Sequence, residues 1–255
     1  MRLLPLLAIS LALSGCQGEK SKQSANSEAQ GQSGATQPGT STAPAATPAA
    51  PDSAIAQLLD GAVNPRQQGI YPPRDDCGPV PGARAFREKL ARAVLTKDVE
   101  AIVALSDGHV KLGFGGVDGR ENLRKRLQDP AYLAEWKAVL GLGCAIDPGG
   151  QLVLPWHFAQ ELGVDDPYSA MLVTASEQPL LEQASPQGAR LGTLSWDTVS
   201  LVDGLKPDAA YQQVRTRNGK TGFVETRALR SLLDYRLLAT SRGSTWRVTA
   251  MVAGD

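Results

Sequence analysis

The chain is poor in the side chains that most often bind metals or perform catalysis. Its 255 residues include two histidines and three cysteines, and neither H-x-x-x-H nor C-x-x-C spacing occurs. Structural zinc sites need such clustered ligands, so the sequence predicts no metal and no cofactor. Acidic and basic residues number 26 each, which leaves no net charge to attract nucleic acid. We therefore expect neither a metalloprotein nor a nucleic-acid-binding protein.

Long apolar runs are also missing, and the apolar run at the N-terminus is a short one. The opening residues MRLLPLLAISLALSGC place one arginine before about a dozen apolar residues and end in small ones. That layout is typical of a secretory signal, and the run is too short to span a bilayer. The motif Leu13-Ser14-Gly15-Cys16 is similar to the bacterial lipobox. This resemblance implies that residues 1–16 are a lipoprotein signal peptide and that Cys16 is acylated, with palmitate for example.

The expected acyl chains would fix the location of the protein. Each buried methylene contributes about 0.8 kcal/mol, so two or more chains hold a protein on a membrane without a spanning helix. Gln17 follows the cysteine, in place of the aspartate that is associated with inner-membrane retention. The resemblance thus implies a lipid-anchored protein of the bacterial cell envelope that faces the periplasm, with the outer membrane favoured. The alternative is a plain secretory signal with an incidental cysteine.

A segment without large apolar side chains follows, at residues 17–53. It is rich in Ser, Gln, Ala, Pro and Gly and has no aromatic residue, Leu, Ile, Val or Phe to bury. Such a composition cannot offset the entropy of ordering, so we expect a disordered tether. A flexible chain of some thirty-five residues has a typical reach of roughly 30–35 Å, which would hold the folded part off the bilayer.

Cys77 and Cys144 remain as an even pair in a chain that we expect to be exported. In an oxidising compartment such a pair predicts a disulfide, here closing a loop of about 67 residues. The alternative is a catalytic thiol with His157 or His109 as its base. Neither cysteine lies in a nucleophile motif, and we expect His109 on the surface and His157 packed between aromatic side chains. The sequence therefore predicts no catalytic residue.

Residues 54–165 are predicted to form an α+β domain. Phe86, Leu90 and Val94 recur every fourth residue, which indicates one face of a helix. Similar spacing predicts helices in the segments VEAIVALSD, RENLRKRLQD and AYLAEWKAVLGLG, and Asp107-Gly108 would end the first of these. Together these segments indicate a predominantly helical layer.

Two strands are expected in the same domain. In HVKLGFGG the side chains of Val110, Leu112 and Phe114 alternate with smaller or polar ones, which predicts that these three point inward. The second strand lies in GGQLVLPWHF, where Pro155 favours an edge position or a bulge.

This first region resembles the opening of NTF2-like, or SnoaL-like, cone domains. The resemblance rests on Asp98 between two helices, Asp107 before the first strand and Gly119 at the start of the next helix. It implies a cone that holds a catalytic pair or a small ligand, or that mediates assembly. The terminal STWRVTAMVAGD resembles the last strand of such domains. That likeness implies that strands within residues 234–255 complete the first sheet.

Residues 168–232 show a different pattern, of short strands separated by turn residues. The segments AMLVTAS, LLEQAS, ARLGTLSWDTVSLVDG and AAYQQVRTRNGKTGFVET have no helical period and predict a small all-β barrel. Asn218-Gly219 suits a two-residue type I′ hairpin turn, because both central residues of that turn need positive φ. The fold class expected for the whole chain is therefore α+β, with a mixed domain and a small barrel.

The barrel region resembles the bacterial SH3, or SH3b, family from about Met171 to Leu229. LLEQASPQGARLGTL, WDTVSLVDG and YQQVRTRNGKTGFVETRAL follow the order of the family's strands and turns. The chain departs from the family where an arginine-containing stretch is replaced by LLEQASPQ and where Tyr211 replaces the usual tryptophan. The resemblance implies a non-catalytic targeting module for peptidoglycan or another envelope component.

Five side chains could form a ligand-binding groove with aromatic faces and cationic donors: Trp196, Tyr211, Arg215, Arg217 and Phe223. The alternation of β-strand side chains puts the two arginines on one face of their strand. In the alternative interpretation, Tyr211 and Phe223 fill the barrel and the arginines are simply solvated.

The sequence leaves three functions to compare. The first is a non-catalytic, membrane-anchored lipoprotein whose SH3b-like domain binds peptidoglycan or another envelope component. The second is an NTF2-like small-ligand binder or enzyme, and the third is a structural lipoprotein that binds another envelope protein. The composition favours a protein that is not an enzyme, because the chain offers few catalytic side chains.

Overall fold

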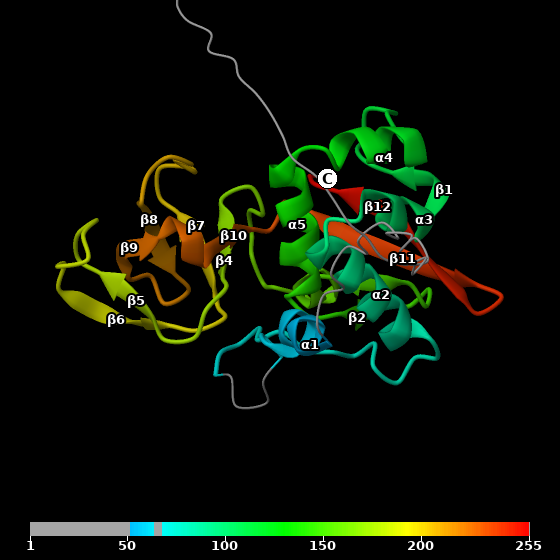
Figure 1. The fold of residues 1–255 in the computed structure, drawn as a ribbon. Helices are drawn as coiled ribbons and strands as arrows, with labels where there is room; N and C mark the ends of the chain where they lie inside the picture. The colour runs from blue at the N-terminus through cyan, green and yellow to red at the C-terminus, as the bar shows by residue number, and fades with distance from the viewer. Residues whose placement is uncertain (1–51, 64–67, 255) are drawn as a thin grey trace, which may run out of the picture. The chain divides into compact units, whose positions relative to one another are not determined.

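The computed structural model describes residues 52–63 and 68–254. Cys16, the expected signal peptide and the expected tether up to residue 51 lie outside the described residues. Within them the chain combines helices with two β-sheets, and it is a mixed α+β protein (Figure 1). None of the helices in this part of the chain is both long and apolar enough to cross a membrane.

The described helices are α1 (Asp52–Asp60), α2 (Ala83–Leu95), α3 (Val99–Ala104), α4 (Arg120–Arg126) and α5 (Pro130–Leu140), with 3-10 turns η1 (Trp156–Ala159) and η2 (Thr226–Ala228). Helix α2 buries the side chains of Phe86, Leu90 and Val94, which confirms the predicted apolar face. Asp98 and Asp129 cap α3 and α5 by accepting hydrogen bonds from backbone N–H groups of the first turn. Helices α2 to α5 thus form where the sequence predicts them.

Helix α1 is a feature that the sequence did not predict. It begins at Asp52, two residues inside the expected tether. Its Ile55 and Leu59 are buried against the hydrophobic core, and Asp60 forms an ion pair of 2.6 Å with Arg84 of α2. Helix α1 therefore belongs to the folded body.

The first sheet contains β1 (Ser106–Lys111), β2 (Ala145–Ile146), β3 (Leu152–Leu154), β11 (Arg236–Arg242) and β12 (Thr245–Val252). Its strand order is β1-β12-β11-β3-β2, with β1 parallel to β12 and the other pairs antiparallel. The C-terminal hairpin, orange to red in Figure 1, therefore lies in the middle of a sheet whose other strands come from the first half of the domain. This pairing agrees with the hypothesis that the last strands complete the first sheet.

Helices cover one face of this first sheet and enclose the main core. Trp136 and Leu140 of α5 and Leu90 of α2 are fully buried, as are Leu237 and Met251 of the sheet. Burial of each such side chain contributes about 1.5–3 kcal/mol relative to exposure. The space between the helices and the sheet is therefore filled by apolar side chains.

The second sheet contains β4 (Ala170–Val173), β5 (Gln178–Leu181), β6 (Arg190–Leu194), β7 (Thr198–Leu201), β8 (Tyr211–Thr216), β9 (Thr221–Glu225) and β10 (Leu229–Ser231). Its order is β10-β4-β7-β8-β9-β5-β6, so the two end strands are edges and pairing of the described strands does not close a barrel. The sheet still encloses a core of its own, which includes Val173, Val199, Val214 and Val224.

The structure corrects the expected boundaries around the first strand. Asp107 and Gly108 do not end a helix; they lie inside β1, which begins at Ser106 and pairs with β12. The strand ends at Lys111, before the glycine-rich loop, and Phe114 is 65% exposed instead of pointing inward. Because β1 pairs with β12, the strand begins at Ser106, three residues earlier than the alternation of side chains indicated.

One prediction about a strand and one about a turn are also wrong. Pro155 is neither in an edge strand nor in a bulge, because β3 ends at Leu154 and is flanked by β2 and β11. In the β8–β9 turn only Gly219 has positive φ, at 83°, and its N–H donates to the Thr216 carbonyl at 2.9 Å. These features define a three-residue loop with glycine in the left-handed position, in place of a type I′ turn.

Candidate functional site

The hairpin of β8 and β9 presents alternate side chains on an open face of the second sheet. Val214 and Thr216 of β8 are buried beneath this face. The side chains between them point outward, because neighbours on a strand point to opposite sides. Antiparallel pairing extends the same surface onto β9. We call it the β8–β9 face, and its members are Tyr211, Gln213, Arg215, Thr221, Phe223 and Glu225.

Arg215 supplies the positive charge of the β8–β9 face. The side chain is exposed, and its guanidinium group makes no hydrogen bond or ion pair with another described residue. Phe223 is half-buried and pairs with Gln213, which lies two residues before Arg215 on β8. A guanidinium group carries five N–H donors in a planar fork that fits a carboxylate, and an adjacent aromatic ring offers an apolar surface. The face can therefore bind an anion that carries apolar or sugar groups.

Tyr211 extends the β8–β9 face to a neighbouring hollow. The hollow has a volume of about 440 Å³ and is lined by Pro207, Ala210, Tyr211, Glu225, Thr226 and Arg227. Within it the Arg227 guanidinium binds the Glu225 carboxylate at 2.6 Å. This hydrogen bond raises the pKa of Arg227 above its usual range. Because these two charges neutralise each other, the free charge of the face is that of Arg215.

Arg217 does not join the β8–β9 face. It lies in the turn after β8, where its Nη1 donates to the Tyr71 hydroxyl at 3.0 Å and to the Leu162 carbonyl at 3.4 Å. Its guanidinium carbon also lies 5.9 Å from the centre of the Tyr71 ring. The hydrogen bond to Tyr71 raises the pKa of Arg217. Arg217 therefore holds two distant parts of the chain together.

Trp196 does not join the face either. Only 3% of the side chain is exposed, and its Nε1 donates to the Ser176 hydroxyl at 3.1 Å. The Trp196 carbonyl accepts a hydrogen bond from the Tyr71 N–H at 2.8 Å. The tryptophan is thus a packing residue between the second sheet and the segment that contains Tyr71.

The structure therefore brings three of the five predicted residues together, namely Tyr211, Arg215 and Phe223. Gln213 was missed, although its position between Tyr211 and Arg215 on one strand could have identified it. Tyr71, the partner of Arg217, lies 146 residues away along the chain, so local sequence carried no signal for that contact.

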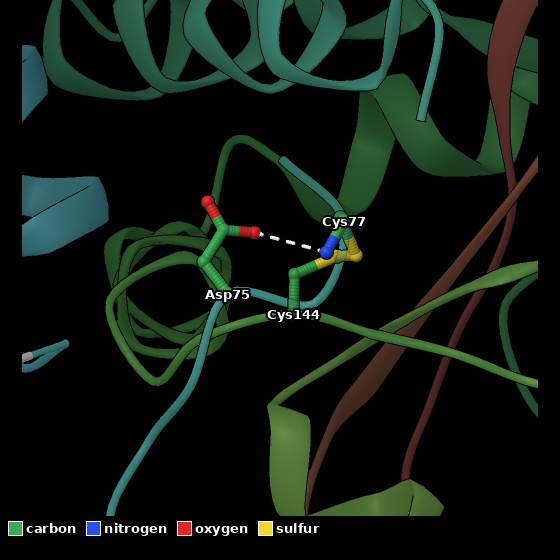
Figure 2. Close-up of side chains that lie close together, drawn as sticks. All are labelled: Asp75, Cys77 and Cys144. Atoms are coloured by element: carbon green, nitrogen blue, oxygen red, sulfur yellow. Dashed lines mark hydrogen bonds between the residues drawn. A yellow bond between two sulfur atoms is a disulfide. The ribbon is translucent and has the colours of Figure 1, made fainter. Parts of the chain in front are cut away.

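Cys77 and Cys144 form a disulfide bond with an S–S distance of 1.91 Å (Figure 2). Asp75 lies close to both sulfur atoms, and these three side chains are near enough to suggest a metal site. One carboxylate oxygen of Asp75 instead accepts hydrogen bonds from the Cys77 N–H at 3.2 Å and from the buried Arg87 at 2.5 Å. With both sulfurs bonded and the carboxylate paired with a cation, the cluster does not offer the ligands that a metal needs.

The two histidines have very different surroundings. The His109 side chain is fully exposed, whereas His157 is 3% exposed and stacks on Phe158 with ring centres 4.8 Å apart. Burial lowers the pKa of His157 to about 3, and the charge of Arg230 adds to the shift. A histidine with so low a pKa is a weak proton acceptor near neutral pH.

A second polar cluster lies between α5 and β10. Arg230 is 9% exposed and contacts Glu135 at 3.3 Å and Asp234 at 3.4 Å. Burial raises the pKa of Glu135, and the charge of Asp234 adds to this effect. Beside it lies a hollow of about 440 Å³, lined by Arg126, Asp129, Ala131, Tyr132, Glu135 and Tyr235. This hollow is on the surface, outside the filled core.

Comparison with known proteins gives no match: no family model, no curated protein and no solved structure matches the chain. The resemblances to SH3b and NTF2-like domains therefore rest on the sequence patterns alone.

Proposed function

We propose that the protein is a non-catalytic, lipid-anchored envelope protein whose second sheet is an SH3b-like module that binds peptidoglycan or another envelope component. One observation carries this proposal: Arg215 is exposed and without a partner among the described residues, on the same face as Phe223 and Tyr211. A free cation beside aromatic rings fits a ligand that combines carboxylates with sugar or apolar groups.

Peptidoglycan offers that combination, because its stem peptides carry carboxylates and its strands carry sugars. A charge-assisted hydrogen bond from a guanidinium group contributes about 1.5–3 kcal/mol where the pair is partly desolvated, and less where it is fully exposed. One arginine with aromatic neighbours therefore supports binding of modest affinity. Attachment to the membrane would compensate by keeping the protein close to its ligand.

The proposed anchor is an acylated Cys16, with the folded part on the periplasmic side and the outer membrane favoured. This part of the proposal rests on the lipobox-like sequence and on Gln17. Mass spectrometry of the mature chain should find Cys16 as an acylated N-terminal residue. A Cys16→Ser variant that fractionates with membranes like the parent would contradict the anchor.

The partner is identified by testing two kinds of target with the full-length Cys16→Ser chain, which cannot be acylated at residue 16. The chain should sediment with purified peptidoglycan sacculi, and Arg215→Ala should weaken sedimentation about tenfold. Arg242→Ala is the matched control, because Arg242 is also exposed but lies at the end of β11 in the first sheet. Capture of one envelope protein without sacculus binding would favour the structural, protein-binding alternative.

A second candidate function is a small-ligand binder or enzyme with an NTF2-like first domain. The surface hollow beside Tyr132 favours it, since guanidinium, carboxylate and aromatic groups converge there. For such a function, binding of the small ligand should be lost in Glu135→Gln and unchanged in Arg215→Ala. If the protein binds the envelope through the β8–β9 face, binding to sacculi should instead weaken in Arg215→Ala and stay unchanged in Glu135→Gln.

A further inference from the structure

Residues 69–77 form an irregular segment that touches both sheets. We call it the strap. It follows α1 in the chain and leads into α2, and its two ends make different sets of contacts. These contacts suggest that the strap does more than connect two helices.

The first end of the strap is held by two connections of the second sheet, the one between β6 and β7 and the turn after β8. A side chain at Gly69 would place its Cβ atom 2.2 Å from the Ser195 carbonyl oxygen, so the backbones touch directly. The Tyr71 N–H donates to the Trp196 carbonyl at 2.8 Å, and the Tyr71 hydroxyl accepts from Arg217 at 3.0 Å. The end at Tyr71 is therefore fixed by backbone and side-chain contacts.

The second end of the strap is held by Cys144 and Trp156, on either side of β2 and β3 of the first sheet. The Cys144 N–H donates to the Arg74 carbonyl at 2.8 Å, and the Asp76 N–H donates to the Cys144 carbonyl at 2.9 Å. The Asp76 carboxylate accepts from Trp156 Nε1 at 2.6 Å. The disulfide adds a covalent bond between this end of the strap and Cys144.

Two prolines join the ends of the strap, in the sequence Tyr71-Pro72-Pro73-Arg74. Consecutive prolines restrict φ and favour an extended, semi-rigid backbone. A displacement at Arg74 is therefore passed on to Tyr71, because the two residues between them cannot absorb it freely.

We propose that the strap is a redox-sensitive latch: the Cys77–Cys144 disulfide fixes its second end, and the proline pair transmits that constraint to the contacts of Tyr71 beside the second sheet. Opening the disulfide loosens Trp196, in the connection from β6 to β7, and Arg217, in the turn after β8, although both lie far from the cysteines in the sequence. The latch does not depend on which ligand the β8–β9 face binds.

The redox step is ordinary thiol–disulfide exchange. A dithiol reductant supplies two electrons and two protons, the S–S bond breaks, and the products are two cysteine thiols and the oxidised reductant. Both sulfur-bearing residues are fully buried, so the reductant acts when the strap opens locally. The oxidised protein is accordingly the latched form.

Hydrogen–deuterium exchange of the full-length chain tests the latch. In a Cys77→Ser, Cys144→Ser variant, amides of residues 74–77 and 144 should exchange faster, and so should those of Tyr71 and Trp196, by about tenfold or more. If the serine variant does not fold, the parent chain after dithiothreitol treatment gives the same comparison. Faster exchange confined to residues near the two cysteines would overturn the proposal.

A second variant separates transmission by the strap from general loosening. Pro72→Gly, Pro73→Gly keeps the disulfide and both sets of contacts but makes the link flexible. In this background, opening the disulfide should accelerate exchange at residues 74–77 and leave Tyr71 and Trp196 unchanged. Equal acceleration at Tyr71 with and without the prolines would show that the strap does not transmit the constraint.

Discussion

Arg215 and Arg217 are two residues apart and have opposite roles in the structure. Arg215 lies in the regular part of β8, so alternation directs it outward into solvent. Arg217 lies beyond the end of the strand, where the turn directs it toward Tyr71. A change at Arg215 therefore bears on ligand binding, whereas a change at Arg217 bears on the contact with the strap.

His157 makes the stability of the protein depend on pH. Its folded-state pKa is about 3, below the ordinary value of 6.5, so the unfolded chain binds the extra proton more readily. The contribution of neutral His157 to the free energy of unfolding is complete above about pH 6.5 and is lost as the pH falls toward 3. Between pH 7 and 4.5 the parent should lose about 2–3 kcal/mol of unfolding free energy from this group.

Urea denaturation at the two pH values measures this effect. His157→Gln should remove most of the pH-dependent loss, because glutamine does not titrate. His109→Gln is the control, since His109 is fully exposed, and it should keep the parent's pH dependence. A His157→Gln variant with the same pH dependence as the parent would contradict the assignment.

Among the elements, β9 packs against β5 through a glycine. A Cβ atom at Gly222 would lie 2.8 Å from the Leu180 side chain and from the Leu181 carbonyl oxygen. We expect Gly222→Ala to lower the unfolding free energy by about 1–3 kcal/mol, because the neighbours must move to make room. Gly192→Ala in β6 should change it by less than about 1 kcal/mol, because no atom lies within 4 Å of the new methyl group. Equal effects of the two changes would contradict this packing.

The sequence predicted the long elements better than the short ones. Helices α2 and α5 follow from the spacing of their apolar residues, and the outward direction of Arg215 follows from strand alternation. The two-residue strand β2 and the three-residue strand β10 are too short to show any period. The predicted type of the β8–β9 turn was wrong because Asn218-Gly219 also fits a three-residue loop. In that loop the Thr216 hydroxyl accepts a hydrogen bond from the Lys220 N–H at 3.0 Å.

In the whole molecule, pairing between strands that are far apart in the sequence determines the sheets, which the local sequence pattern does not specify. The first sheet takes β1, β2 and β3 from before the second sheet and β11 and β12 from after it. Trp196 and Arg217 are likewise fixed by a residue far away in the sequence, because both contact Tyr71. Neither contact could be predicted from neighbouring residues, so two of the five candidate site residues were misplaced.

The disulfide is the covalent link of this arrangement, joining residues 67 apart in the sequence. Alkylation in denaturant without reductant should label neither Cys77 nor Cys144 of the exported chain. Replacement of both by serine should lower the unfolding free energy by about 2–5 kcal/mol, since the unfolded chain is then no longer constrained. Labelling of both cysteines before reduction would show that the pair is not oxidised in the protein.

The central claim, that the β8–β9 face binds an envelope ligand, is tested most directly by nuclear magnetic resonance. Soluble muropeptides are titrated into the isotope-labelled, full-length Cys16→Ser chain, and the backbone amide shifts are followed. The account predicts that the largest changes occur in β8 and β9 and that they disappear in Arg215→Ala. Largest changes around Tyr132 and Glu135, or no change at millimolar muropeptide, would contradict it.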